Sequence, residues 1–213
     1  MKTILITGCA GFIGYHLAKK FIKKNFYIVG IDSINNYYDQ SLKKNRVKNL
    51  RKYKNFKFYK INLINKKKII EIFRKEKIYK IFHLAAQAGV RHSLTNPHDY
   101  IDNNISVFLN IIQIANKFKI KEIFYASSSS VYGQQKNIDL KENLEPKPIQ
   151  FYAVSKLTNE NMAEVYSSLY NIRFIGMRFF SNYFFNPINI FFQRIIVLIC
   201  NIKNFMFAFN FNI

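Results

Sequence analysis

A short apolar run near the start of the chain breaks into a glycine-rich turn and continues as an amphipathic stretch. The segment from Lys2 to Tyr15 reads KTILITGCAGFIGY, with Gly8, Gly11 and Gly14 at every third position. In a strand–turn–helix unit, the first glycine permits the tight turn and the second lets a pyrophosphate approach the backbone. The third lets the helix pack close to the sheet, and the helix N-terminal amides then face the phosphates. The spacing therefore predicts a dinucleotide site, with a purely structural glycine turn as the alternative.

A second predicted strand supports the nucleotide interpretation. Residues Tyr27 to Ile31 are mostly apolar and lead into Asp32. This acid stands close to the offset of about 20 residues at which a carboxylate binds an adenosine ribose diol. Further strands, alternating with helices, are expected over residues 55–61, 78–83, 121–126 and 173–177, and the helices over about 41–52, 65–75, 99–118 and 152–170. Such alternation is typical of an α/β fold, a Rossmann-like doubly wound parallel sheet with helices on both faces.

The composition narrows the classes of function. The chain of 213 residues is long enough for one domain with a large core, and it carries 33 Lys and Arg against 12 Asp and Glu, a net charge of +21. A basic chain can bind nucleic acid, which is the alternative interpretation of this charge. Because the lysines are spread over predicted helices and loops, we interpret them as residues on solvent-exposed faces, and we do not expect nucleic-acid binding as a main function. No apolar run approaches about 18 residues, so no membrane span is expected. Two cysteines, Cys9 and Cys200, make neither a disulfide framework nor a metal cluster, so we expect a cytoplasmic protein without a bound metal.

Tyr152 and Lys156 stand four residues apart on a predicted helix, so their side chains share a face. A neighbouring ammonium favours the phenolate, which predicts a lowered pKa for Tyr152 and a role as general base. Such a pair also occurs by chance on solvated helices. Ser127 to Ser130 follow the fifth predicted strand, where a hydroxyl can hydrogen-bond both the tyrosine and a substrate oxygen, although serine runs alone are usually loops. Together with the upstream nucleotide site, these groups predict hydride transfer.

Several motifs taken together carry a family resemblance. They are TGCAGFIG from Thr7, HLAAQAGVRHS from His83, ASSSSVYG from Ala126 and Tyr152-x-x-x-Lys156. The chain resembles the extended short-chain dehydrogenase/reductases, specifically the NAD-dependent epimerase/dehydratase family, and is most similar to the UDP-glucuronate 4-epimerases. The loop SINNYYD after Asp32 and the segment NPHDYIDNN from Asn96 to Asn104 also resemble that subgroup. The resemblance runs from Met1 to about Tyr183.

The resemblance implies NAD as cofactor and a nucleotide sugar, a UDP-hexuronate or UDP-hexose, as substrate. Tyr152 would take the proton from the sugar C4 hydroxyl while NAD⁺ accepts the C4 hydride, with Ser128 and Lys156 completing the catalytic group. The keto sugar would then turn over and take the hydride back on its other face. Family members often dimerise through helices near 99–118 and 152–170, so a homodimer is expected. The implied cofactor residues are Gly8, Gly11, Phe12, Ile13, Gly14, Asp32, Leu84, Ala85, Ala86, Asn104, Tyr152 and Lys156, and the implied substrate residues are Arg91, Ser128 and Ser129.

For the other polar residues, the sequence indicates either a structural role alone or a choice between a binding role and a structural one. Arg91 is either an anion-binding guanidinium or a surface arginine. Arg178, at the end of the sixth predicted strand, is interpreted as a buried, hydrogen-bonded strand-end residue, and His83 and His92 as structural. Related 4,6-dehydratases place an acidic pair after the catalytic Ser/Thr; Ser129 and Ser130 stand there instead, so elimination of water is not expected.

The resemblance stops after Tyr183. Residues 184–213 are rich in Phe, Ile and Asn, have no clear helical or strand period, and lack the Arg-Pro-Asp motif with which the family continues. We therefore divide the chain into an NAD-binding domain, 1–183, and a divergent tail, 184–213, and expect a truncated or frameshifted reading frame. Because most of the nucleotide-sugar domain would then be missing, the alternative to an active epimerase is an inactive NAD-binding remnant or subunit.

Overall fold

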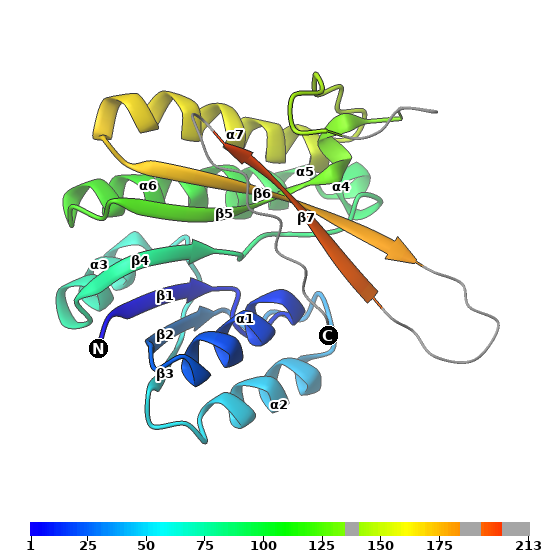
Figure 1. Cartoon of the computed structure of the whole chain (residues 1–213). Helices are drawn as coiled ribbons and strands as arrows, with labels where there is room; N and C mark the ends of the chain where they lie inside the picture. Colours follow the sequence, from blue (N-terminus) through cyan, green and yellow to red (C-terminus); the bar gives the residue numbers. More distant parts are fainter. Residues whose placement is uncertain (135–140, 184–192, 202–213) are drawn as a thin grey trace.

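The computed structural model describes residues 1–134, 141–183 and 193–201, which contain a single sheet of seven strands (Figure 1). The strand order is β3-β2-β1-β4-β5-β6-β7. The strands are β1 (Thr3–Thr7), β2 (Tyr27–Asp32), β3 (Phe56–Lys60), β4 (Ile78–His83), β5 (Glu122–Ser128), β6 (Arg173–Tyr183) and β7 (Gln193–Asn201). All neighbouring pairs from β3 to β6 are parallel, which confirms the predicted doubly wound parallel sheet.

The last strand, β7, lies in the tail to which the sequence analysis assigned no element. β7 pairs antiparallel with β6, in a register running from Ile175 opposite Asn201 to Tyr183 opposite Gln193. The sequence has no clear helical or strand period here, so β7 is an element that the sequence analysis did not assign. Periodicity misses such a segment because the run IIVLIC is continuously apolar. An antiparallel edge strand on a parallel sheet is common. The rest of the predicted tail, residues 184–192 and 202–213, lies outside the described residues.

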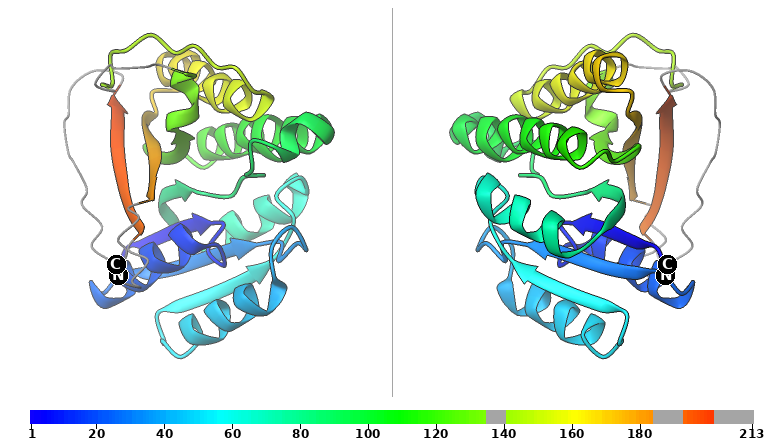
Figure 2. Two further views of the ribbon diagram at one scale, coloured as in Figure 1. Left: turned by 90° about the vertical axis from the view of Figure 1, so that its right-hand side faces the viewer. Right: turned by 90° about the vertical axis from the view of Figure 1, so that its left-hand side faces the viewer.

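Helices cover both faces of the sheet (Figures 1 and 2). Side chains alternate along β1, so that Ile4 and Ile6 pack in the core with α1, while Leu5 packs in the core with α3, α6 and α7. The helices are α1 (Phe12–Lys23), α2 (Gln40–Leu50), α3 (Lys66–Lys75), α4 (His92–Thr95), α5 (Pro97–Tyr100), the π-helical η1 (Ile101–Ser106), α6 (Val107–Lys117), the 3-10 turn η2 (Ser129–Tyr132) and α7 (Phe151–Tyr170). Within the described ranges, every helix is too short or too polar to cross a bilayer.

The helix predicted over residues 99–118 is present, but it is not α-helical throughout. It begins at Pro97 as the α-helical turn α5, widens into the π-helical turn η1 and returns to α-helix at Val107. The widened turn carries Asn104, whose amide accepts a hydrogen bond from the Gln87 backbone N–H at 2.8 Å and donates to Ser155 Oγ at 2.9 Å. Asn104 thereby ties η1 both to the segment after β4 and to α7. Such π-helical turns are frequent next to functional sites.

The order of the strands fixes where a ligand can bind. β1 and β4 are neighbours, and the chain builds the sheet away from β1 on one side and away from β4 on the other. A crevice forms beyond the carboxyl ends of two such strands. The glycine-rich turn follows β1, and Leu84 to Ala86 follow β4, so the fold brings both predicted cofactor segments to this switch point.

Candidate functional site

The glycine-rich turn forms a close-fitting cradle between β1 and α1. Gly8 has φ of +70°, and a Cβ on it would lie 2.8 Å from the backbone nitrogen of Ala85. A Cβ on Gly14 would collide with the carbonyl oxygen of Gly8. Gly11 is the N-cap of α1, where no side chain caps the first-turn amides. The cradle therefore leaves helix N-terminal amides for an anionic group, as a pyrophosphate site requires.

Asp32 lies at the carboxyl end of β2, beside this cradle. Its carboxylate accepts hydrogen bonds from the backbone N–H of Ala10 at 3.1 Å and of Ile34 at 2.8 Å. These bonds fix the carboxylate against the turn, as recognition of a ribose diol requires. A cavity of about 140 Å³ brings together six of the predicted cofactor residues, namely Gly8, Gly11, Asp32, Leu84, Ala85 and Ala86.

Thr7 and His83 join the ends of β1 and β4 behind the cavity. The Thr7 hydroxyl accepts hydrogen bonds from the backbone N–H of Leu84 and of Ala85, each at 3.1 Å. It therefore donates to His83 Nδ1, which lies 2.9 Å away. This bond assigns the proton of the neutral imidazole to Nε2. Burial, reinforced by the charge of Lys156, lowers the pKa of His83 to about 3.

The buried imidazole predicts acid-sensitive stability. His83 stays neutral in the fold but binds a proton in the unfolded chain below about pH 6.5. Its stabilising contribution is thus complete above that pH and is lost as the pH falls toward 3, by up to about 1.4 kcal/mol per pH unit. Urea unfolding at several pH values should show a shallower acid limb for His83→Gln than for the exposed His98→Gln. Equal acid slopes for the two variants would contradict this assignment.

Tyr152 and Lys156 project from α7 toward the end of β5. The Tyr152 side chain hydrogen-bonds with that of Ser128. Lys156 Nζ donates to the carbonyl oxygen of Ala126 at 3.0 Å and lies 6.0 Å from the centre of the Tyr152 ring. The structure therefore assembles the three predicted catalytic residues into one group.

The predicted lowering of the Tyr152 pKa was wrong for this structure. Burial raises the pKa of Tyr152, and the hydrogen bond with Ser128 offsets this only in part. The Lys156 ammonium points at the Ala126 carbonyl, and burial lowers the pKa of Lys156 to about 8 although Glu160 opposes the shift. Sequence spacing placed the cation on the correct helix face, but it could not show that a backbone carbonyl binds it.

The remaining predicted site residues lie in different surroundings. Ser128 caps η2, where its Oγ accepts hydrogen bonds from the N–H and hydroxyl of Ser130, and Ser129 is the first residue of that turn. Asn104 is buried and reaches the cavity through Gln87, a residue that lines it. Outside the lining of this cavity are Phe12 and Ile13, the first residues of α1, and Arg91, an exposed residue before α4. Their ligand roles stay predictions.

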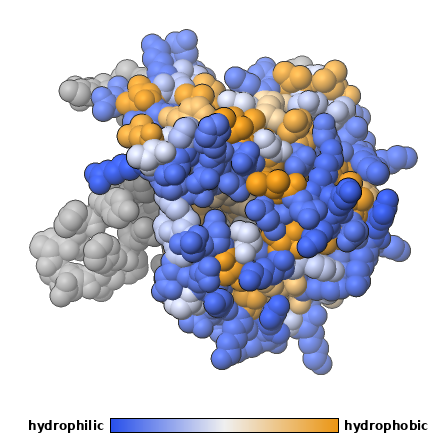
Figure 3. All heavy atoms as spheres, turned by 180° about the vertical axis from the view of Figure 1, so that it is seen from behind, coloured by the Kyte–Doolittle hydropathy of each residue, from blue (hydrophilic) through white to orange (hydrophobic). Residues whose placement is uncertain are grey.

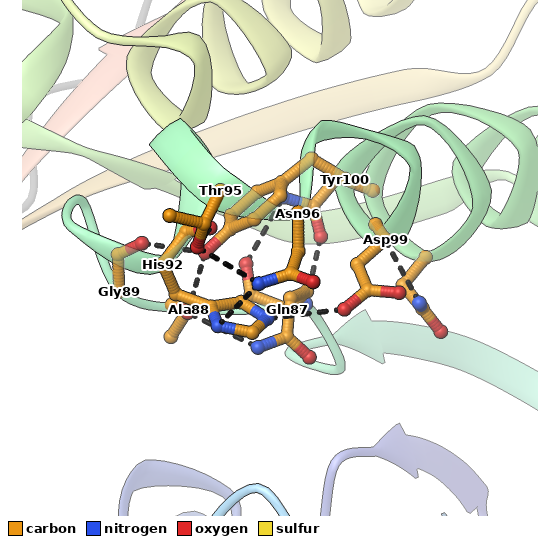
Figure 4. Close-up of polar contacts among 10 residues, drawn as sticks. Gln87, Ala88, Gly89, His92, Thr95, Asn96, Asp99 and Tyr100 are labelled. Carbon is orange, nitrogen blue, oxygen red and sulfur yellow. Dashed lines mark hydrogen bonds and ion pairs between the residues drawn. The ribbon is translucent and has the colours of Figure 1, made fainter.

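The segment after β4 forms a hydrogen-bonded wall with the start of the following helix (Figure 4). The Tyr100 hydroxyl donates to the carbonyl oxygens of Ala88 and Gly89, and the Tyr100 ring meets the Tyr152 ring edge-on with centroids 6.0 Å apart. His92 Nε2 lies 3.0 Å from Asp99 Oδ2, and its Nδ1 lies 3.3 Å from the Asn96 amide nitrogen. With both ring nitrogens bonded inside the wall, His92 has the structural role that the sequence predicts.

Sequence reasoning missed the partner of Arg178. The guanidinium is buried as predicted, and it binds both carboxylate oxygens of Glu160, at 2.9 and 2.7 Å. The only signal in the sequence was spacing, since Glu160 follows Lys156 at the same four-residue interval that separates Lys156 from Tyr152.

Known proteins are similar to this chain over most of its length. The family described as GDP-mannose 4,6 dehydratase matches residues 5–206. Protein CapI of Staphylococcus aureus is 49% identical over 182 residues, covering 84% of this chain and 54% of the relative. UDP-glucuronate 4-epimerase of Thermodesulfobacterium geofontis is 38% identical over 186 residues, covering 86% and 57%. The crystal structure of UDP-glucuronic acid 4-epimerase from Bacillus cereus with UDP-glucuronic acid and NAD is 31% identical with a TM-score of 0.78, covering 84% of this chain and 57% of that one. The chain thus spans little more than half the length of these relatives.

Proposed function

The chain belongs to the family described as GDP-mannose 4,6 dehydratase, and from that premise we propose that it is an NAD-dependent nucleotide-sugar 4-epimerase acting on UDP-glucuronate. One observation carries the proposal. The pair of Tyr152 and Ser128, with Lys156 beside it, stands at the same edge of the sheet as the glycine cradle. The proposal includes a cytoplasmic location, where the buried thiol of Cys9 stays reduced.

The cavity residues fit NAD. Gly8 and Gly11 would face the pyrophosphate, since a Cβ on Gly8 would close the gap between the turn and Ala85. Asp32, already held by two backbone amides, would bind the adenosine ribose. When bound, the nicotinamide supplies a reversible acceptor for the hydride of sugar C4.

The side chains of this chain supply the proton chemistry. Tyr152 takes the proton of the sugar C4 hydroxyl as C4 is oxidised, and it returns that proton after the keto sugar has turned over and has been reduced on its other face. Because burial raises the pKa of Tyr152, its ionisation depends on the Ser128 hydrogen bond, which lowers that pKa. Ser128 also orients the sugar oxygen.

The same residues favour epimerisation over elimination of water. A dehydratase needs an acid to protonate the leaving hydroxyl. The two residues after Ser128 are Ser129 and Ser130, which carry only hydroxyls. The nearby carboxylate of Glu160 is bound on both oxygens by Arg178.

Incubation with UDP-glucuronate, and with UDP-glucose in parallel, tests the proposal by proton NMR of the sugar C4 signals. We expect the C4-inverted product from UDP-glucuronate, and NAD released when the purified protein is denatured. NAD without product identifies the inactive remnant instead. Absence of both contradicts the proposal and the remnant together.

We also propose that the chain forms a homodimer through α7. Val154, Val165 and Leu169 share one face of this helix and are exposed to 40%, 56% and 67%. Hydrophobic side chains gather along the upper edge of the molecule in Figure 3, the edge that α7 forms in Figure 1. Exposed apolar side chains that share one face of a helix are typical of an interface.

Charge on this face should separate the subunits. Light scattering should give twice the chain mass of 25.3 kDa for the native protein. Leu169→Glu should give the single chain mass, because an unpaired carboxylate would be buried in the interface. Leu42→Glu, on exposed α2, is the matched control and should remain dimeric. A native protein with the single chain mass would refute the dimer.

A further inference from the structure

One face of α7 contacts the last residues of β5 through three consecutive turns. Tyr152 hydrogen-bonds with Ser128, and Lys156 donates to the carbonyl of Ala126. One turn further on, Glu160 accepts a hydrogen bond from the hydroxyl of Ser127. Three side chains at a four-residue spacing therefore bind three successive residues of one strand, although only the first two belong to the catalytic group.

In the third of these contacts, Glu160 is itself bound by a second side chain, that of Arg178. Glu160 and Arg178 form a bidentate ion pair, with side chains exposed to 11% and 5%. Arg178 stands opposite Ser127 in the pairing of β5 with β6. Its guanidinium also donates to the carbonyl of Glu142 at 3.2 Å and lies 4.7 Å from the centre of the Tyr132 ring. The ion pair thus connects α7, the end of β5, β6 and the segment that follows η2.

We propose that Glu160, clamped by Arg178, is a positioning residue that holds Tyr152 and Lys156 in register with Ser128. The proposal rests on the epimerase function for its consequence in turnover, but the geometry it describes belongs to the folded chain alone. Because a helix is rigid over two turns, fixing Glu160 against Ser127 fixes where Lys156 and Tyr152 meet the strand. Bidentate carboxylate–guanidinium pairs supply the necessary geometric specificity.

Charge gives Glu160 a second effect on the same group. Lys156 is fully buried and faces Glu160 on its own helix and His83 from β4. Because Glu160 favours the charged ammonium, its removal should lower the pKa of Lys156 further below about 8. Loss of register with Ser128 should raise the pKa of Tyr152, since the Ser128 hydrogen bond lowers it.

The variant Glu160→Gln keeps the shape of the side chain and removes its charge, and Glu164→Gln, at an exposed position one turn further along α7, is the matched control. Chains labelled at lysine Cε and tyrosine Cζ with ¹³C can be titrated by NMR, with the two signals assigned by their loss in Lys156→Met and Tyr152→Phe. In Glu160→Gln, we expect the Lys156 midpoint to fall by about one pH unit and the Tyr152 midpoint to rise. Glu164→Gln should titrate like the native chain. Turnover of UDP-glucuronate should fall roughly 10- to 100-fold, as expected for a catalytic group displaced by about 1 Å.

The titrations distinguish a positioning role of Glu160 from a purely stabilising one. A lowered melting temperature with unchanged titrations of Lys156 and Tyr152 would show that Glu160 only stabilises the fold, and would overturn the proposal. The double variant Glu160→Gln/Arg178→Met leaves neither charge buried alone, so it provides the same titrations if the single variant does not fold. If the two midpoints shift as expected but the native chain forms no product, the positioning role stands and the epimerase function fails.

Discussion

Replacing Tyr152 with phenylalanine is expected to reduce epimerisation of UDP-glucuronate by at least about 10³-fold while leaving NAD in the protein. In the proposed mechanism the phenol takes the C4 proton, while the Ser128 hydroxyl hydrogen-bonds with it and the Lys156 ammonium is directed at Ala126. Loss of a general base commonly costs 10² to 10⁴ in rate, about the size expected here. The ring itself remains, so its edge-on packing against Tyr100 should persist.

The measurement compares Tyr152→Phe with Tyr170→Phe, a tyrosine at the far end of the same helix. Product is followed by NMR, and NAD by its release on denaturation. Tyr170→Phe should retain native turnover, which controls for the loss of a phenol from α7. Undiminished turnover in Tyr152→Phe would remove Tyr152 from the mechanism. Loss of NAD together with turnover would instead show that the substitution damaged the cofactor cleft.

Local patterns predicted most of the fold because they report interactions within a few residues. The helix predicted over residues 65–75 begins at Lys66, and its N-cap residue Asn65 accepts a hydrogen bond on Oδ1 from the Lys68 N–H at 3.2 Å. The strand predicted over residues 78–83 has those bounds, since its apolar run is closed by the turn at Leu84. The glycine-rich cradle could also be predicted from the sequence, because the turn itself requires a glycine at φ of +70°.

What the sequence left open depends on contacts between distant residues. Glu160 and Arg178 are 18 positions apart, and only the packing of α7 against β6 makes them a pair. The direction of the Tyr152 pKa likewise depends on burial and on where the Lys156 ammonium points, which spacing along a helix does not specify. The π-helical turn η1 carries Asn104, whose bonds to Gln87 and Ser155 join distant segments, and no periodicity encodes those bonds.

Two glycine substitutions should separate the structural role of the cradle from its role in binding. A methyl group on Gly14 collides with the carbonyl oxygen of Gly8, so α1 must move away from the turn. We expect Gly14→Ala to destabilise the fold by roughly 3 kcal/mol or more, since overpacking against rigid backbone has no flexible side chain to absorb it. A methyl group on Gly11 meets the same oxygen at 3.1 Å, which a small shift relieves.

Gly11→Ala should therefore fold with nearly native stability and yet lose NAD, because its methyl group occupies the approach of the pyrophosphate to the helix amides. Urea unfolding gives the stability of both variants, and calorimetric titration with NAD gives the affinity, which we expect to fall at least about tenfold in Gly11→Ala. Native NAD affinity in Gly11→Ala would place the pyrophosphate elsewhere and would remove the basis for every catalytic role assigned to Tyr152. The binding result needs no substrate, so it tests the cofactor site even in a chain that forms no product.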